Sequence, residues 1–167
     1  MVQIAEESID IARDVSEVFA FVSDISNDVT WHTTVVEGHR VSDGPIGPGA
    51  RFEGTYDSHR RTLDTPPDPA NFQPLVATIT EYVPDRALRT RVEFTGPLRG
   101  VGARVLGRSF DLTFRFEPVP GGTRVFRGGD IRPVALVRPI IPLFMRANTG
   151  RSRYLLANLK RAIEGPR

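Results

Sequence analysis

Alternating apolar and polar residues dominate the middle of the chain and predict an antiparallel β-sheet. The clearest stretch is residues 108–117, in which Phe110, Leu112, Phe114 and Phe116 share one side and polar residues share the other. Clusters of glycine and proline separate this stretch from similar ones and mark the turns between them. The pattern predicts seven strands, which lie at residues 2–12, 34–41, 50–57, 75–83, 86–95, 108–117 and 123–132.

Helical periodicity brackets most of these strands. An amphipathic segment at Val15–Ser23 predicts a short helix, and the capping signal Ser26-Asn27-Asp28 predicts a second short helical turn after it. The period becomes helical again from about Leu143 to Ile163, and Gly165-Pro166 ends that helix. A run of strands bracketed by helices favours an α+β fold with an antiparallel sheet over an alternating βαβ fold.

Two connections between strands are unusually long. Residues 59–74 contain four prolines, and we predict that they form an irregular insert. Residues 96–107 contain four glycines, and we predict that they form a loop. Because both segments connect strands, we expect them to shape a binding site rather than to change the fold.

Several short motifs resemble one known family in their order and spacing. They are Ile9-Asp-Ile-Ala12 followed by Val15–Asp24 and Trp31, Gly47-Pro-Gly-Ala-Arg-Phe52, Thr80-Glu-Tyr-Val-Pro-Asp-Arg86, Gly121-Gly-Thr-Arg-Val125 and Leu159-Lys160. From about Ile4 to Glu164 the chain resembles the polyketide cyclase/dehydrase and lipid-transport family (SRPBCC) of the START-like, Bet v 1-like superfamily. The resemblance implies a helix-grip fold, in which a curved seven-stranded sheet wraps a long C-terminal helix and two short helices lie between the first two strands.

The composition is that of an ordinary globular protein. The 167 residues are 40% apolar and 25% charged, which suits a single START-like domain at 1–167. The absence of cysteine from the sequence excludes disulfides, a cysteine nucleophile and thiolate metal sites. The first residues are acidic where a signal peptide would be basic, and the longest apolar run, 140–145, contains a proline. We therefore expect a cytoplasmic protein without stable membrane insertion.

Charge is unevenly distributed, although the net charge is only +2. Residues 1–60 carry 11 acidic and 4 basic side chains, whereas residues 131–167 carry eight basic side chains and one acidic side chain. Such asymmetry can indicate an anionic partner. We prefer the alternative that the first strand and the last helix are neighbours and neutralise each other. The basic residues spread around the last helix, so we predict no nucleic-acid partner.

In the fold that the resemblance implies, the curved sheet cannot close fully against one helix, and a cavity normally remains between them. Apolar walls with a few polar groups are typical of small-molecule sites. The residues that we expect to bind a ligand there are Trp31, Phe52, Tyr56, Phe94, Phe110, Phe114, Phe144, Asn148 and Ser152. The alternative for the aromatic residues is that they fill an ordinary hydrophobic core.

Polar residues interrupt the apolar face of the C-terminal helix. The face comprises Phe144, Asn148, Ser152, Leu155, Leu159 and Ile163, with Thr149 and Arg151 on its flank. A buried polar group without a partner costs about 1–3 kcal/mol. Asn148 and Ser152 therefore predict a wet or ligand-filled cavity, unless this face turns toward solvent.

Two histidines are the candidate catalytic residues. His32 falls in the second short helical turn, where it can act as a general base with a pKa near neutrality; the alternative is a surface helix residue. His59 begins the insert and lies either on a lid or on a solvated loop. Local His pairs, a nucleophile elbow, a dinucleotide fingerprint and a P-loop are missing from the sequence, so we predict no metal and no cofactor.

Three functions follow from these patterns. The leading one is binding of a hydrophobic or aromatic small molecule, lipid-like or polyketide-like, between the sheet and the C-terminal helix. The resemblance also implies an enzyme of the polyketide cyclase or dehydratase type, which can work chiefly by shaping a reactive substrate. A third is an interaction protein that uses the basic C-terminal helix. Catalysis and a homodimer both stay open, since a fold does not fix a function.

Overall fold

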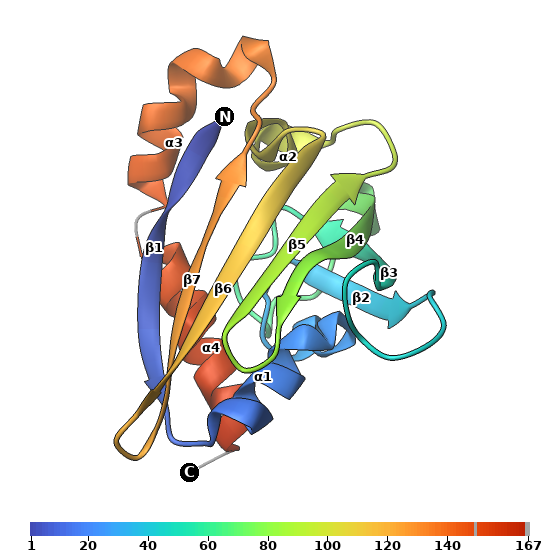
Figure 1. Cartoon of the computed structure of the whole chain (residues 1–167). Coiled ribbons are helices and arrows are strands. Elements are labelled where there is room, and N and C mark those ends of the chain that lie inside the picture. The colour runs from blue at the N-terminus through green and yellow to red at the C-terminus, as the bar shows by residue number, and fades with distance from the viewer. Residues whose placement is uncertain (149, 166–167) are drawn as a thin grey trace.

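A seven-stranded antiparallel sheet forms the centre of the computed structural model, which describes residues 1–148 and 150–165 (Figure 1). Along the sheet the strand order is β1-β7-β6-β5-β4-β3-β2. The strands are β1 (Val2–Ile11), β2 (Val35–Arg40), β3 (Arg51–Asp57), β4 (Phe72–Val83), β5 (Ala87–Phe94), β6 (Ser109–Val119) and β7 (Gly122–Ile131). Each strand predicted from the sequence is present, with ends that differ by at most three residues.

Helices flank the sheet, and the longest follows the last strand. They are α1 (Val15–Ser23), η1 (Ile25–Thr30), η2 (Pro69–Asn71), α2 (Gly100–Leu106), η3 (Ala135–Ile140), α3 (Ile141–Ala147) and α4 (Arg151–Glu164). The short helices α1 and η1 lie between β1 and β2, as expected. Helix α4 runs along β1, where the Lys160 ammonium donates to the Asp10 carbonyl at 2.6 Å. The curved sheet and α4 confirm the α+β helix-grip fold.

The C-terminal helix is interrupted, which corrects the prediction of one continuous helix over residues 143–163. Helix α3 ends at Ala147 and α4 begins at Arg151. Between them Gly150 has a φ of +88°, in the left-handed region that a regular helix of L-residues cannot continue through. Thr149, which the sequence placed on the flank of the helix, lies outside the described residues.

The glycine-rich segment 96–107 also differs from its prediction, because it contains the helix α2. Gly100 and Gly107 have φ values of +76° and +83° and stand at the two ends of this helix. Ala103 and Val105 between them are fully buried. The glycines therefore delimit a short packed helix and do not form the loop that the glycine content predicts.

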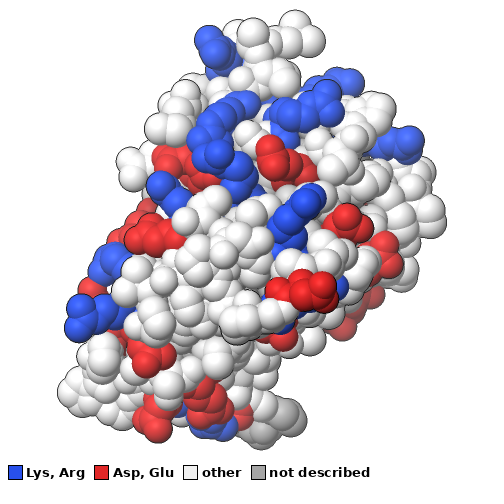
Figure 2. All heavy atoms as spheres, turned by 45° about the vertical axis from the view of Figure 1, so that its right-hand side comes forward, with Lys and Arg blue, Asp and Glu red and all other residues white. Residues whose placement is uncertain are grey.

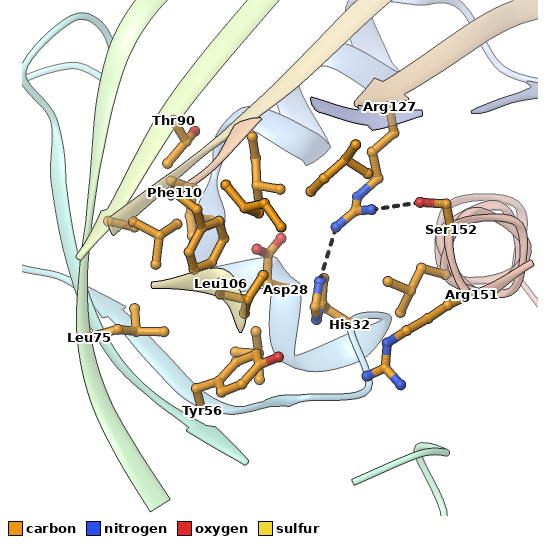
Figure 3. A pocket seen from close by; sticks show the side chains of 18 of the residues that line it. Asp28, His32, Tyr56, Leu75, Thr90, Leu106, Phe110, Arg127, Arg151 and Ser152 are labelled. Atoms are coloured by element: carbon orange, nitrogen blue, oxygen red, sulfur yellow. Dashed lines mark hydrogen bonds between the residues drawn. The ribbon is translucent and has the colours of Figure 1, made fainter. Parts of the chain in front are cut away.

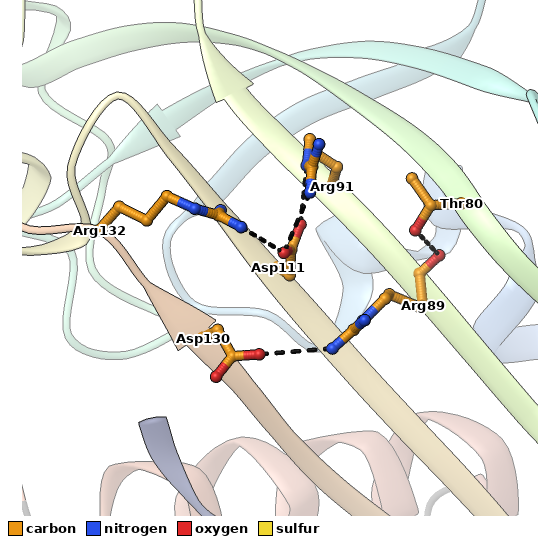
Figure 4. Close-up of polar contacts among 6 residues, drawn as sticks. All are labelled: Thr80, Arg89, Arg91, Asp111, Asp130 and Arg132. Carbon is orange, nitrogen blue, oxygen red and sulfur yellow. Dashed lines mark hydrogen bonds and ion pairs between the residues drawn. The ribbon is translucent and has the colours of Figure 1, made fainter. Parts of the chain in front are cut away.

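On the outer face of the sheet, Asp111 is buried although the alternation of β6 placed it toward solvent. Its side chain is only 5% exposed because Arg91 and Arg132 cover it, each with an N–O distance of 2.9 Å (Figure 4). Burial favours a higher pKa for Asp111, but the hydrogen bonds from these arginines outweigh it and lower the pKa below its ordinary value. Since Arg91 belongs to β5 and Arg132 follows β7, this carboxylate ties neighbouring strands together.

Ion pairs link the acidic first strand to the basic later part of the chain. Glu7 on β1 pairs with Arg153 on α4 at 2.9 Å, and Asp10 pairs with Arg124 on β7 at 2.7 Å. On the face drawn in Figure 2, acidic and basic side chains are interspersed. The structure thus supports internal neutralisation as the main reason for the uneven charge.

Candidate functional site

A cavity of about 470 Å³ lies between the inner face of the sheet and helices α3 and α4 (Figure 3). Its position is the one expected from the sequence, and its volume is in the range of small-molecule sites, about 300–1,000 Å³. Most of its wall is apolar. The apolar lining includes Val22, Leu75, Ala77, Leu88, Val92, Val105, Leu106, Phe110, Leu112, Phe114, Ile131 and Leu155.

The structure brings most of the predicted ligand-binding residues to this cavity. Those that line it are Phe52, Tyr56, Phe110, Phe114, Phe144, Asn148 and Ser152. Trp31 and Phe94 lie instead in the packed core, where they are 1% and 2% exposed. Phe94 packs against Tyr56 and Phe110 with ring centroids 5.4 and 5.8 Å apart, so it supports the lining aromatic rings from behind.

The polar positions of the C-terminal helix border the cavity, where they are half-buried. Phe144, Asn148, Ser152 and Leu155 all contribute to its lining, although the helix is interrupted between α3 and α4. The Asn148 amide donates to the Phe144 carbonyl at 2.8 Å and accepts from Arg61 at 3.3 Å. The side chain of Asn148 is thus hydrogen-bonded at the cavity wall. This position agrees with the prediction that the polar residues of the helix border a wet or ligand-filled cavity.

His32 is a buried residue of the cavity wall, which corrects both the surface position and the near-neutral pKa considered for it. It is 9% exposed. Burial lowers the pKa of His32 well below its ordinary value, and the nearby positive charges of Arg127 and Arg151 lower it further. The imidazole is therefore neutral at physiological pH.

The hydrogen bonds of His32 also fix which ring nitrogen carries the proton. A guanidinium only donates, so Nε2 accepts from Arg127 at 3.3 Å. Nδ1 then carries the hydrogen and donates it to the Thr34 hydroxyl at 3.0 Å. Since both nitrogens are engaged, His32 holds Arg127 in place more readily than it takes a proton from a ligand.

Arg127 is the buried cation of the cavity. Alternation along β7 turns it inward together with Val125 and Ile131, and it is 5% exposed. Its guanidinium donates to the Ser152 hydroxyl at 3.2 Å as well as to His32. Burial lowers the pKa of Arg127 to about 10, so the group stays charged at neutral pH. Figure 3 shows it reaching from β7 toward α4 and His32.

Asp28 brings a titratable carboxyl to the same end of the cavity. This corrects the expectation from the sequence that Asp28 belongs to a helix cap. The cap is formed by Asp24 instead, whose carboxylate accepts from the Ser26 backbone N–H at 3.2 Å. Asp28 points into the cavity near His32 (Figure 3). Burial raises the pKa of Asp28 to about 7, although Arg127 and the Trp31 indole act to lower it.

Two more side chains complete the polar end. Arg151 at the start of α4 lines the cavity and donates to the Thr33 hydroxyl at 3.5 Å, and burial lowers its pKa. Burial also raises the pKa of the Tyr56 hydroxyl above its ordinary value, against the attraction of Arg151. The cavity therefore has an apolar body and one end at which arginine, carboxyl, imidazole and phenol groups meet.

His59 lies apart from this polar end. It is exposed on the segment after β3, where its backbone N–H donates to the Asp57 carboxylate at 2.9 Å. Among the described residues that line the cavity, His32 is included and His59 is not. The structure thus does not bring the two candidate catalytic histidines together, and His59 has the setting of a solvated loop residue.

A metal-ligand cluster is not present in the described part of the chain, where no three His, Asp or Glu side chains converge. Within residues 1–148 and 150–165, no helix is both long enough and apolar enough to cross a membrane.

Comparison with known proteins identifies the family. The sequence profile described as "Polyketide cyclase / dehydrase and lipid transport" matches residues 2–164. The chain belongs to this polyketide cyclase/dehydrase and lipid-transport family. Family and fold are consistent with hydrophobic ligand binding or with polyketide cyclase activity. None of the curated protein sequences matches this chain.

Solved structures share the fold of this family member at low sequence identity. The crystal structure of Ara h 8.0201 aligns with a TM-score of 0.65, 11% identity and 97% of each chain covered. The di-domain ARO/CYC BexL from the BE-7585A biosynthetic pathway aligns with a TM-score of 0.68 and 20% identity, over 98% of this chain and 47% of BexL. Protein NE0264 from Nitrosomonas europaea aligns with a TM-score of 0.64 and 12% identity, over 98% of this chain and 94% of NE0264.

Proposed function

We propose that this family member binds a hydrophobic or aromatic small molecule in the cavity between the sheet and helices α3 and α4. The observation that supports the proposal is the cavity itself, about 470 Å³ with a mostly apolar wall and a polar end around Arg127. An apolar ligand would gain about 25 cal/mol for each Å² of surface that it buries there. The polar end would orient the ligand.

Filling the cavity tests this proposal. Leu75 lines the cavity from β4, and Val76 is its neighbour on the opposite face of the same strand. We expect Leu75→Phe to weaken binding of a cavity ligand roughly tenfold, which corresponds to about 1.4 kcal/mol. Val76→Phe adds the same ring outside the cavity and should leave binding unchanged. Fluorescence titration measures both affinities, and equal affinities of the two variants would contradict the proposal.

Asp28 and Arg127 favour a second function, a cyclase or dehydratase activity on a polyketide-like substrate. A carboxyl whose pKa is about 7 is suited to transfer protons in either direction at neutral pH. Ionised Asp28 would take a proton from a carbon next to a carbonyl, and the enolate would form a carbon–carbon bond to a second carbonyl. Protonated Asp28 would then give its proton to the new alkoxide. Arg127 would stabilise the negative oxygen during these steps.

The catalytic proposal predicts a clear difference between two variants. Asp28→Asn should reduce turnover of a linear poly-β-ketone mimic by about 100-fold or more, as loss of a general acid–base group does. His59→Ala changes an exposed residue outside the cavity and should keep full activity. Product formation followed by chromatography tests both variants. Undiminished turnover by Asp28→Asn would exclude this role and leave the binding proposal intact.

A further inference from the structure

Two arginines line the polar end of the cavity and a third, which is exposed, lies beside it; each donates to a neutral acceptor. Arg127 on β7 donates to the hydroxyl of Ser152 and to neutral His32. Arg151 on α4 donates to the Thr33 hydroxyl. Arg61, which precedes β4, donates to the side-chain carbonyl of Asn148. These partners accept hydrogen bonds but do not balance the positive charge, and among the described residues the buried Nε of Arg127 has no hydrogen-bond partner.

Two of the carboxylates that line the cavity, those of Glu7 and Glu37, are engaged with other residues. Glu7 is directly opposite Arg127 in the pairing of β1 with β7, yet its carboxylate pairs with Arg153 at 2.9 Å. Glu37 accepts from the Thr55 hydroxyl at 2.6 Å. Within the described residues, Arg127 has no carboxylate partner within ion-pair distance. Asp28 is the carboxyl that interacts electrostatically with Arg127. At neutral pH, however, Asp28 is only partly ionised.

A buried cation without a counter-charge is unfavourable, because its hydration is lost and no anion replaces it. Arg127 is 5% exposed and faces an apolar cavity. Its guanidinium presents several N–H donors in a planar fork, the geometry that pairs with a carboxylate. Arg151 adds a second positive charge on the other side of His32, since both arginines act on the His32 imidazole. An anion is thus the missing component of this end of the cavity.

We propose that the ligand of this cavity carries an anionic oxygen, such as a carboxylate, which binds between Arg127 and Arg151 while its apolar body lies against the aromatic wall. The proposal rests on the proposed ligand-binding function and names the chemical class of that ligand. A fatty acid and a polycyclic aromatic acid share this chemistry and differ in the body that the apolar wall receives. The head group gives orientation, and the body gives most of the buried apolar surface.

Asp28 links this binding to protonation. A bound anion beside Asp28 disfavours a second negative charge, so the Asp28 carboxyl takes up a proton when the ligand binds. The charged and polar groups around Asp28 are Arg127 from β7, Asp24 from its own segment, the Trp31 indole and the neutral imidazole of His32. Since free Asp28 is about half protonated at pH 7, we expect uptake of about half a proton for each ligand bound. Affinity for an anion should accordingly fall as the pH rises above about 7.

Matched ligand pairs test the proposal on the intact protein. Dodecanoate is compared with dodecanol, and anthracene carboxylate with anthracene methanol, by calorimetric titration at pH 7. Within the pair whose body fits the cavity, we expect the carboxylate to bind at least tenfold more tightly than the alcohol. Repeating the titration in buffers of different ionisation enthalpy measures proton uptake, which Asp28→Asn should abolish. Which pair binds tells whether the cavity accepts a linear or an aromatic body.

Arginine variants locate the head group. Arg151→Gln should weaken carboxylate binding about tenfold and change alcohol binding less than twofold. Arg138→Gln removes the same charge from an exposed position on η3 and should change neither affinity. Arg127→Lys keeps the positive charge but loses the planar guanidinium, so it should weaken carboxylate binding. A thermal melt reports whether this variant still folds. If Arg127→Lys does not fold, the affinities of Arg151→Gln alone test whether the carboxylate binds at this end of the cavity.

Each outcome separates the two proposals. The anionic ligand is supported if the unmodified protein binds the carboxylate more tightly than the alcohol and Arg151→Gln abolishes this preference. Equal binding of carboxylate and alcohol by the unmodified protein overturns the anionic ligand but keeps the cavity as a ligand site. Failure of both members of both pairs to bind overturns the ligand-binding function and the anionic ligand together.

Discussion

Burial gives Asp28 an acid–base behaviour unlike that of an exposed aspartate. Its pKa rises to about 7 in the folded protein, against an ordinary value of 3.8. The folded state therefore binds a proton more tightly than the unfolded chain does between these two values. The free energy of unfolding should be highest below about pH 4 on this account and should fall as the pH rises toward 7. This carboxyl thus lowers stability at neutral pH, as is common for groups kept for a function.

Asp28→Asn should stabilise the protein at pH 8, because the amide is neutral at every pH. A shift of one pKa unit corresponds to about 1.4 kcal/mol, so we expect a gain of about 1–3 kcal/mol at pH 8 and little change at pH 4. Urea unfolding at the two pH values measures it. Asp43→Asn alters an exposed loop carboxyl and serves as the control. A variant no more stable than the unmodified protein at pH 8 would contradict the raised pKa of Asp28.

The roles of individual residues could be predicted only in part from the sequence. The prediction of which side chains of β6 point inward was correct, because apolar and polar residues alternate regularly along this strand. The position of Asp28 in the cavity was missed because the sequence Ser26-Asn27-Asp28 is a typical capping signal for a short helix. Which aspartate caps the helix depends on local backbone geometry. Arg127 did leave a signal, since it occupies an inward position of the last strand among Thr123 and Val125. The low pKa of His32 arises from its burial first and from the charges of Arg127 and Arg151 second, and all of these depend on residues that are distant in sequence.

At the scale of elements, the interruption between α3 and α4 positions the polar end of the cavity. Asn148 is the residue that follows and caps α3, Arg151 and Ser152 begin α4, and all three line the cavity. Gly150 permits the change of direction because its φ is +88°. A continuous helix would carry these side chains at a fixed angular spacing. The interruption lets α3 and α4 each present its own residues to the sheet.

Gly150→Ala tests the importance of this interruption. Open space surrounds the added methyl, so the cost is backbone strain of about 1–2 kcal/mol for an L-residue in the left-handed region. We expect that loss of stability together with weaker ligand binding, because Arg151 and Ser152 shift. Gly44→Ala places the same methyl at a φ of +82° in a distant loop, also in open space, and should lower stability without changing binding. Equal binding by both variants would show that the interruption does not shape the site.

Elements were predictable where one period extends over many residues, and they were missed where glycine has two possible meanings. Strands β1 to β7 follow a clear alternation with turn residues between them, so their order fixed the fold. Gly100 and Gly107 were interpreted as a loop although they delimit α2, and Gly150 was accepted inside a helix. A single sequence does not tell whether such a glycine ends a helix, breaks it or only tolerates it.

At the scale of the whole molecule, the uneven charge and the cavity are connected. Acidic side chains of β1 pair with arginines on β6, β7 and α4, as Glu6 with Arg115, Asp10 with Arg124 and Glu7 with Arg153 do. These exposed pairs each contribute little to stability. Their consequence for the site is indirect, since Glu7 is held on Arg153 and leaves the buried Arg127 without a carboxylate. Arg127 from β7 and Arg151 from α4 therefore place positive charge at the wall of the cavity.

The existence of the cavity followed from the sequence through the family resemblance, but its size and polar end did not. Both depend on how closely α3 and α4 approach the sheet, which is set by packing between residues far apart in the chain. Most of the predicted aromatic residues line the cavity, whereas Trp31 and Phe94 are packed behind it. Side-chain alternation predicts the inner face of a strand, and it does not tell which inner residues border empty space.

The central claim is that the cavity between the sheet and helices α3 and α4 is a ligand site with a cationic end. A crystal structure of the protein with dodecanoate or anthracene carboxylate tests it most directly. The account predicts ligand density along Leu75, Phe110 and Phe114, with the carboxylate within hydrogen-bond distance of Arg127 or Arg151. A cavity closed by side chains, or a ligand whose carboxylate points away from both arginines, would contradict it.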